Sequence, residues 1–382
     1  MDTAPEISKR PPFEACVALA PLTVGGNLPF RRLCVELGAQ VTFGEMAVVR
    51  RLLGHRRGEF ALLRFHPDEP FFGAQLADRN AETLAEGARL AESRGSRFVD
   101  LNCGCPIDDI TRKGLGSSLL RKPARLGRLV EAMVRAVSIP VTVKIRAGWS
   151  EKETNAAEVA RVCEESGAAA LTIHGRTREQ RYSRKADWDL VGRVAAERGI
   201  PVLGNGDILT HYEARERRTQ SGVASLMIGR GALIKPWIFR EILEDREWLP
   251  TAEERFRLVW HYVELLREHF GEGDLNRERI RRFLTWHLGF FCRYRPFPEA
   301  EYAQAAREHP LLQTRQADLG EVDALERILR HSGSDVHASM AARLEESTAV
   351  DDARSAVLAL GDTLPQTDAA ADDVSSLREV AG

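Results

Sequence analysis

The run VTVKIR at residues 141–146 is followed by ALTIHG at 170–175 and PVLGNG at 201–206, three short apolar segments that decide the fold. Segments of this length, rich in β-branched residues, are typical of buried strands, and the stretches between them carry apolar residues at helical spacing. The same kind of segment recurs on both sides, at 16–21, 41–46, 71–76, 98–103 and 225–230. Eight strands that alternate with helices predict a parallel sheet.

A closed barrel fits this repeat better than an open sheet. Eight strand–helix units over about 230 residues match a (β/α)₈ (TIM) barrel. An open doubly wound sheet would normally carry a glycine-rich GxGxxG motif after its first strand, whereas the first segment here runs into Pro21-Leu22-Thr23. We therefore predict an α/β fold built on a (β/α)₈ barrel.

Polar side chains fall at or just beyond the carboxyl end of every predicted strand. In a barrel these ends meet at the one face that carries the active site. Any single polar residue could simply end a strand, but eight at the same relative position predict a catalytic face. They are Thr23, Glu45, Gln75, Asn102, Lys144, His174, Asn205 and Arg230.

The remaining chain predicts a smaller all-helical domain and a tail. We expect an N-terminal extension at 1–13, the barrel at 14–246, a helical domain at 247–332 and an acidic, low-complexity tail at 333–382. Residues 345–382 hold nine acidic residues and two Arg, and their net charge of −7 leaves +5 for residues 1–344. A segment rich in Ser, Ala, Asp and Thr without aromatic residues is typical of disorder, so we expect the tail to be disordered.

Composition excludes several classes of protein. Hydrophobic residues make up 43% and charged residues 29%, as in ordinary globular domains. No apolar run approaches the roughly 18 residues of a membrane span, and no signal-peptide pattern opens the chain. Six scattered cysteines form neither a disulfide framework nor paired zinc spacing. We expect a cytoplasmic protein, or a nuclear one in a eukaryote, without membrane contact or bound metal.

Two groups of basic residues are candidates for RNA contact. Between Arg277 and Arg295 six Arg alternate with aromatic residues, and basic side chains neutralise phosphates while rings stack on bases. A solvated helix face over an aromatic core is the alternative, and ordinary surface charge is the alternative for the rim residues, since the chain has 47 Arg against 7 Lys. The candidate contacts are Lys113, Arg176, Arg178, Arg181, Arg279, Arg282 and Arg293.

Strands seven and eight end in the glycine-flanked sequences Gly204-Asn205-Gly206-Asp207 and Gly229-Arg230-Gly231. The loops at these positions of a barrel commonly bind phosphate, and glycine allows the backbone to approach it closely. Lys144 and His174 could meet an electron-rich heterocycle such as a flavin, where a cation stabilises the charge of the reduced ring.

These residues resemble the tRNA-dihydrouridine synthases, and within that family the class 3 branch best known from eukaryotes. The resemblance covers roughly residues 14–300. The motifs that carry it are APLTVGGNLPFRR (20–32), GEM (44–46), LNCGCPID (101–108), VKIR (143–146), HGRTREQRY (174–182), ADW (186–188), GNGDI (204–208) and GRGA (229–232).

The resemblance implies an FMN-binding barrel, a helical domain that grips tRNA, and NADPH as the reductant. It implies Cys105 as the active cysteine and uridine 47 of the tRNA as the target. The class commonly carries CCCH zinc fingers before the barrel, and no such spacing occurs in this sequence. Motif by motif, the residues expected to hold FMN are Pro21, Leu22, Thr23, Gln75, Lys144, His174, Asn205, Gly206, Asp207, Gly229 and Arg230.

The chemistry of the residues agrees with that role. Reducing the C5=C6 bond of uracil needs a hydride at C6 and a proton at C5. A thiol with an ordinary pKa near 8.5 is mostly protonated at neutral pH, so Cys105 is a candidate general acid, with Asn102 beside the substrate. The rival interpretation joins Cys103 and Cys105 as a disulfide or metal pair. The rival functions are an FMN barrel oxidoreductase acting on a small molecule, similar to dihydroorotate dehydrogenase, and a non-catalytic RNA-binding protein.

Overall fold

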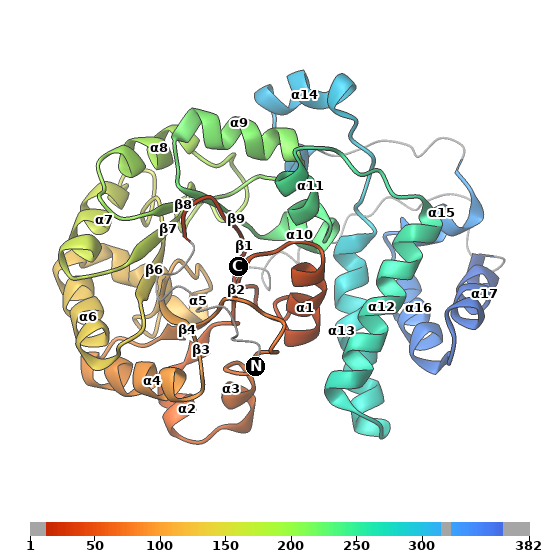
Figure 1. The fold of residues 1–382 in the computed structure, drawn as a ribbon, viewed down its shortest axis with the longest axis horizontal. Helices are drawn as coiled ribbons and strands as arrows, with labels where there is room; N and C mark the ends of the chain where they lie inside the picture. Colours follow the sequence, from red (N-terminus) through yellow and green to blue (C-terminus); the bar gives the residue numbers. More distant parts are fainter. Residues whose placement is uncertain (1–12, 315–321, 362–382) are drawn as a thin grey trace, which may run out of the picture. The chain divides into compact units, whose positions relative to one another are not determined.

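A parallel strand forms in each of the eight segments that the sequence predicts, and the strands close into a barrel (Figure 1). They pair in the order β2-β1-β9-β8-β7-β6-β5-β4, and β2 also pairs with β4, which closes the ring. A short additional strand, β3 (Ala47–Val48), pairs in parallel with Leu76 and Ala77 at the end of β4. The eight are β1 (Val17–Leu19), β2 (Val41–Phe43), β4 (Phe72–Ala77), β5 (Phe98–Cys103), β6 (Val141–Arg146), β7 (Ala170–His174), β8 (Val202–Asn205) and β9 (Ser225–Ile228). The predicted (β/α)₈ barrel is confirmed.

The computed structural model describes residues 13–314 and 322–361. By their contacts these residues form two compact units. The barrel unit comprises the described residues up to Pro21, Gln40–Gly206 and Arg217–Met227. The helical unit comprises Leu22–Ala39, Asp207–Glu216 and the described residues from Ile228 on, so the boundary crosses α9 (His211–Ser221). The predicted extension at 1–13 lies outside the described residues except for Phe13.

Helices surround the strands of the barrel unit in the order that the sequence predicts (Figure 1). Two of them begin at side-chain caps, where Asn80 accepts from the backbone N–H of Thr83 and Asp187 from that of Leu190. Their bounds are α2 (Val49–Leu53), α3 (Arg57–Ala61), α4 (Ala81–Ser93), α5 (Asp108–Thr111), the 3₁₀ helix η1 (Gly116–Arg121), α6 (Pro123–Ala136), α7 (Ala156–Glu165) and α8 (Trp188–Ala196).

Aromatic rings fill the amino-terminal end of the barrel. Phe98, at the start of β5, meets Phe13 at 5.2 Å and Phe43 at 4.9 Å, both edge to face, and stacks on Phe71. Gly73 makes room for this cluster, because a Cβ there would lie 2.1 Å from the Phe98 ring. Because side chains fill the amino-terminal end, a ligand would bind at the carboxyl ends of the strands, where barrels carry their active sites.

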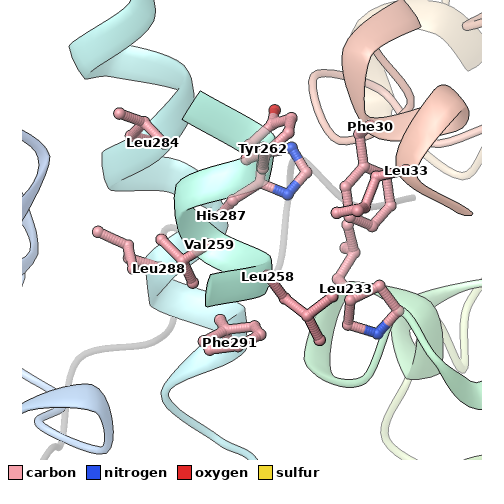
Figure 2. Close-up of a pocket in the computed structure, with 11 residues that line it drawn as sticks. Phe30, Leu33, Leu233, Leu258, Val259, Tyr262, Leu284, His287, Leu288 and Phe291 are labelled. Atoms are coloured by element: carbon pink, nitrogen blue, oxygen red, sulfur yellow. The ribbon is translucent and has the colours of Figure 1, made fainter. Parts of the chain in front are cut away.

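The helical unit is built on α12 (Ala252–Phe270) and α13 (Asp274–Phe291). A capping box formed by Thr251 and Glu254 opens α12. Helix α1 (Leu28–Glu36), which the sequence prediction placed in the barrel domain, belongs to this unit. Figure 2 shows Phe30 and Leu33 of α1 facing Tyr262 and His287 around an apolar pocket. The other helices are α10 (Arg230–Ile234), α11 (Ile238–Glu244), α14 (Glu299–Glu308), η2 (Leu311–Gln313), α15 (Ala324–Leu329), α16 (Ser334–Glu346) and α17 (Val350–Gly361).

Helices α16 and α17 correct the prediction that the chain is disordered from residue 333. Met340 and Leu344 are buried on one face of α16. The Glu345 carboxylate pairs with Arg277 at 3.0 Å and with Arg281 at 2.8 Å, both on α13. Acidic residues that look like solvated charge in the sequence are therefore partly neutralised across two helices. Residues 362–382 of the predicted tail lie outside the described residues.

No described helix has the length and apolar character to cross a membrane.

Candidate active site at the carboxyl ends of the strands

Cys105 lies in the loop after β5, and hydrogen bonds fix both its backbone N–H and its carbonyl. The Asn102 Oδ1 accepts from the Cys105 N–H at 3.0 Å and from the Gly104 N–H at 3.3 Å. The Cys105 carbonyl accepts from the Ser117 N–H at 3.1 Å and from the Ser117 hydroxyl at 2.9 Å. Gly116 has φ +60°, and a Cβ there would lie 2.7 Å from the Cys105 carbonyl oxygen. The position of the thiol is thus fixed by local geometry.

The Cys105 side chain is buried, with 4% of its surface exposed. Burial raises the pKa of its thiol, an effect that Arg146 and Lys144 partly oppose. A raised pKa keeps the sulfur protonated at neutral pH, which suits a proton donor. Cys103 is fully buried at the end of β5, and both cysteines are free thiols. The disulfide between them that rivalled the general-acid interpretation is not formed.

A chain of side-chain hydrogen bonds lies behind the Cys105 loop. The Thr142 hydroxyl donates to Asp100 Oδ1 at 2.6 Å, and Gln75 Nε2 donates to Asp100 Oδ2 at 2.8 Å. Gln75 Oε1 then accepts from Asn102 Nδ2 at 2.7 Å. A carboxylate only accepts, so Asp100 sets the direction of the Gln75 amide and, through it, that of Asn102.

Asp100 was missed by the sequence prediction, although a signal was present. It lies two residues before Asn102 on β5, and a strand repeats its face every two residues, so both side chains face the barrel interior. Burial raises the pKa of Asp100 to about 6.

Lys144 lies beside Asn205, which is the last residue of β8. The ammonium Nζ donates to Asn205 Oδ1 at 3.2 Å, while Asn205 Nδ2 donates to the Met227 carbonyl at 2.8 Å. Burial, reinforced by the nearby Arg146, lowers the pKa of Lys144 to about 8. Lys144 is also the cross-strand partner of Asn102. Two of the predicted cofactor residues and one predicted substrate residue are therefore brought together.

Arg146 connects the loops after β5 and β7 by hydrogen bonds. The sequence analysis did not predict it as a site residue. Its Nε donates to the Gly104 carbonyl at 2.7 Å, and its Nη1 donates to the Thr177 carbonyl at 3.2 Å. The side chain is 2% exposed. Arg146 follows Lys144 by two residues on β6, so the same alternation that places Lys144 in the barrel places Arg146 there too.

The structure corrects the role predicted for Arg176. Its side chain is 0% exposed, donates to the Arg184 carbonyl, and lies with Nη1 3.2 Å from His174 Nε2. An RNA backbone cannot reach such a group in this conformation, so Arg176 is an interior contact of His174. Gly206 also approaches His174, since a Cβ at its φ of +129° would lie 3.2 Å from His174 Cδ2.

Arg178 and Arg181, predicted to bind RNA, both pair with Asp108 on α5. The Arg178 guanidinium also lies over the Trp149 ring, 4.7 Å from its centroid. Lys113 is exposed at the end of the same loop that carries Cys105. Basic side chains therefore lie near the loop that carries Cys105.

In the helical unit, Asp207 and Arg230 form the second group of predicted cofactor residues. Asp207 is buried in a left-handed conformation with φ +53°, and its Oδ1 lies 3.6 Å from Arg230 Nη2. Its Oδ2 accepts from Gln313 Nε2 at 3.1 Å. Gly231 allows the two loops to approach, because a Cβ there would lie 2.2 Å from the Ile208 carbonyl oxygen.

The other predicted cofactor residues lie at strand exits. Pro21, Leu22 and Thr23 follow β1, with Leu22 buried and the other two partly exposed, and Gly229 precedes α10. Their positions agree with the prediction that they lie at the carboxyl ends of strands, and the described contacts assign them no further role.

The predicted RNA cluster on α13 divides into two parts. Arg277 and Arg281 hold Glu345, as described above. Arg279 and Arg282 are exposed and lie over Phe270 and Phe283, rings that stack at 5.6 Å. Arg293 is also exposed and reaches the Leu312 carbonyl at 3.5 Å.

A sequence profile described as dihydrouridine synthase (Dus) matches residues 18–328. This chain belongs to the dihydrouridine synthase family. Curated relatives support the assignment. A tRNA-dihydrouridine(47) synthase [NAD(P)(+)] from Coprinopsis cinerea is 45% identical over 73% of this chain and 43% of its own length. Proteins named tRNA-dihydrouridine(47) synthase [NAD(P)(+)]-like from Oryza sativa subsp. japonica and Homo sapiens are 43% and 42% identical, over 74% and 75% of this chain and 42% and 44% of their own lengths.

The chain spans less than half the length of those relatives. Among solved structures, histamine dehydrogenase from Rhizobium sp. 4-9 matches with a TM-score of 0.44 and 14% identity, over 65% of this chain and 48% of that one. A likeness so distant has no bearing on function.

Proposed function

We propose that this protein is an FMN-dependent tRNA-dihydrouridine synthase that uses NADPH to reduce the C5=C6 bond of uridine 47. The observation that carries the proposal is the buried Cys105, whose backbone is held by Asn102 and Ser117 and whose thiol pKa is raised by burial. Family membership supports the reaction. The printed names of the relatives support NAD(P) as the reductant and position 47 as the target.

The residues present fit a flavin. In the barrel unit, the amides of Gln75 and Asn205 and the ammonium of Lys144 offer donors and acceptors suited to the edge of a heterocycle. Gly206 leaves space beside His174 that a Cβ would fill. In the helical unit, Arg230 supplies a cation suited to a phosphate. We propose that the barrel-unit residues Pro21, Gln75, Lys144, His174, Asn205 and Gly206 contact the flavin.

A bound flavin, once reduced by NADPH, would supply the hydride for C6 of the uracil. Cys105 then delivers the Sγ proton to C5, so one hydride and one proton saturate the double bond. The thiolate that remains lies near the positive charges of Arg146 and Lys144, which lower its pKa together with a hydrogen bond from the Ile107 backbone. Both cations favour the proton transfer, and water restores the thiol after product leaves.

We propose that the tRNA contacts the exposed Lys113, Arg279, Arg282 and Arg293. Arg178 and Arg181 join them only if a phosphate competes with Asp108 for their guanidinium groups. Extruding the target base costs a few kcal/mol, which such phosphate contacts offset.

The test is Cys105→Ala in the full chain, with unmodified tRNA transcript as substrate. We expect the variant to keep flavin colour and tRNA binding and to lose at least about a hundredfold in dihydrouridine formation, the usual size of a general-acid contribution. Mass spectrometry of nuclease fragments measures the product and its position.

Cys163→Ala is the matched control, since Cys163 is a buried cysteine on α7 with no role in the site. Turnover by Cys105→Ala equal to that of this control would remove Cys105 from the mechanism. Product at another uridine would disprove the choice of position 47 alone.

A further inference from the structure

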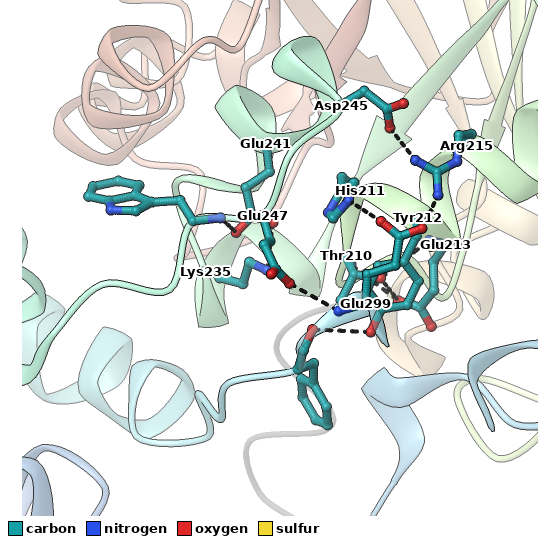
Figure 3. A network of polar contacts seen from close by, with 12 residues as sticks. Thr210, His211, Tyr212, Glu213, Arg215, Lys235, Glu241, Asp245, Glu247 and Glu299 are labelled. Carbon is teal, nitrogen blue, oxygen red and sulfur yellow. Dashed lines mark hydrogen bonds and ion pairs between the residues drawn. The ribbon is translucent and has the colours of Figure 1, made fainter. Parts of the chain in front are cut away.

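Charged side chains are distributed unevenly over the helical unit. Those labelled in Figure 3 are mostly acidic, and two of them, Asp245 and Glu299, pair with the same Arg215. The first turns of α13 are different, because residues 277–282 hold four Arg and one Glu. A phosphate backbone is attracted to a cluster of this kind and not to an acidic network. The four are Arg277, Arg279, Arg281 and Arg282.

The last turn of α16 brings two carboxylates to this cluster. Glu345 Oε1 lies 3.0 Å from Arg277 Nε, and Glu345 Oε2 lies 2.8 Å from Arg281 Nη2. Glu346 Oε1 lies 3.1 Å from the same Nη2 of Arg281. Two of the four arginines are thus neutralised by α16.

Arg267, near the end of α12, binds the backbone of the same turn. Its Nη2 lies within hydrogen-bond distance of the Leu344, Glu345 and Ser347 carbonyls, at 3.1, 2.7 and 2.6 Å. These carbonyls lie at the end of α16, where the helix dipole is negative. The turn therefore presents to three arginines what an RNA backbone would present, which is a group of oxygen atoms with negative charge.

Packing keeps the turn in place, while solvent still reaches the arginines. Met340 and Leu344 are buried, so apolar contacts as well as charge hold α16. Arg277 and Arg281 keep 54% and 40% of their side-chain surface exposed. A phosphate can approach these two arginines from the solvent side, but it meets guanidinium groups whose charge Glu345 already offsets.

We propose that the last turn of α16, residues 344–347, is an internal anion that limits how many tRNA phosphates the helical unit binds. The inference rests on the proposed tRNA substrate. Arg279 and Arg282 then meet RNA at full charge, whereas Arg277 and Arg281 contribute little. Affinity from phosphate contacts is independent of sequence, so the internal anion reduces binding to other RNA. Helices α16 and α17 follow the residues that match the family profile, so family membership does not imply this role.

The test is the binding of labelled tRNA transcript to the full chain at 50 and 200 mM salt, measured by fluorescence anisotropy. Glu345→Gln combined with Glu346→Gln keeps the shape of both side chains and removes their charge. We expect this double variant to bind about tenfold more tightly at 50 mM salt and to lose that gain by 200 mM, the effect of about two additional phosphate contacts. Glu346→Gln alone, at a half-exposed position, should give a gain of about threefold without disturbing the fold.

Two comparisons separate released arginines from a general change in charge. Asp351→Asn with Asp352→Asn removes the same charge at exposed positions of α17, and we expect a gain of less than about twofold because solvent screens it. Adding Arg277→Gln and Arg281→Gln to the Glu345 and Glu346 variant should return the affinity to that of the unmutated protein, since the released arginines are then absent.

A double variant that binds no more tightly than the α17 control would overturn the role of α16. A gain that persists in the quadruple variant would overturn it too, because the gain would not come from the released arginines. An unmutated protein that binds no tRNA at either salt concentration would overturn the proposed substrate itself. That failure is recognised before any residue is changed.

Discussion

The charged residues at the strand ends of the barrel unit and those of the helical unit are paired in different ways. Around Cys105 the partners are fixed by β-strand register, as with Gln75 on β4 and Asp100 on β5. In the helical unit the partners come from distant helices, as with Arg255 of α12 and Glu326 of α15, or Arg281 and Glu345. Register can be read from a sequence, whereas the partner of a helical charge depends on how helices pack.

The largest expected effect is a loss of stability when an ion pair between helices of the helical unit is broken. Glu326 lies between the guanidinium groups of the buried Arg255 and Arg330. Glu326→Ala leaves two buried cations without their shared anion, and we expect a loss of about 3–5 kcal/mol in the free energy of unfolding. Urea unfolding measures it. Glu278→Ala, at an exposed position of α13, is the control and should cost less than about 0.5 kcal/mol. Equal midpoints for the two variants would show that Glu326 is not structurally required.

A second effect concerns the barrel network and depends on pH. The pKa of Asp100 is raised to about 6 and that of Lys144 is lowered to about 8. Below pH 6 Asp100 is protonated and can no longer accept from both Gln75 and Thr142, and above pH 8 Lys144 loses its charge. We expect kcat/KM to fall several-fold outside this range, measured by dihydrouridine formation against pH.

Variants assign the two limbs of that profile. Asp100→Asn should remove the acid limb, and Lys144→Arg should move the alkaline limb upward. A profile with the same two limbs in both variants would contradict the assignment. Below about pH 6, the contribution of Asp100 to stability increases as pH falls, whereas activity decreases. Since the folded state holds the Asp100 proton more tightly than the unfolded chain, its contribution to stability decreases as pH rises from about 4 to 6.

The smallest expected effect is the loss of stability when Glu345 of α16 can no longer pair with the arginines of α13. Glu345 is 3% exposed, but Arg277 and Arg281 are 54% and 40% exposed, so solvent weakens their attraction. We expect Glu345→Gln to cost about 1 kcal/mol at low salt and less at high salt. Glu346→Gln, at the neighbouring exposed position, should cost less. Unfolding monitored at 50 mM and at 1 M salt checks both. A cost that does not change with salt would mean that packing of Leu344, and not charge, holds the helix.

The sequence predicted the barrel well because strands and their ends follow a local pattern. Gln75, Asn102, Lys144 and Asn205 were each identified from their place at the end of a strand, and the structure brings them into hydrogen-bond contact. Asp100 and Arg146 share that pattern at a spacing of two residues. Nothing in the local pattern says how many interior-facing polar residues of one strand take part in a site.

The remaining differences come from contacts between segments far apart in the chain. Arg176 follows a strand as Arg178 does, yet it turns inward to His174, and nothing in its local sequence distinguishes the two. Helix α16 was read as disordered because its composition is acidic, while its partner arginines lie more than 60 residues earlier. The tie from Gln313 to Asp207 spans 106 residues and has no local signature.

The hydrogen-bond chain behind Cys105 also bears on how the barrel assembles. Thr142, Asp100 and Gln75 come from β6, β5 and β4, so the chain crosses three adjacent strands. A one-residue slip of β5 would turn Asp100 and Asn102 to the opposite face and leave the groups on both neighbours unpaired. The same bonds that orient the Cys105 loop therefore favour the observed alignment of the three strands. A barrel closed in another register would lose these bonds, so the alignment of the strands and the geometry of the candidate site depend on the same contacts.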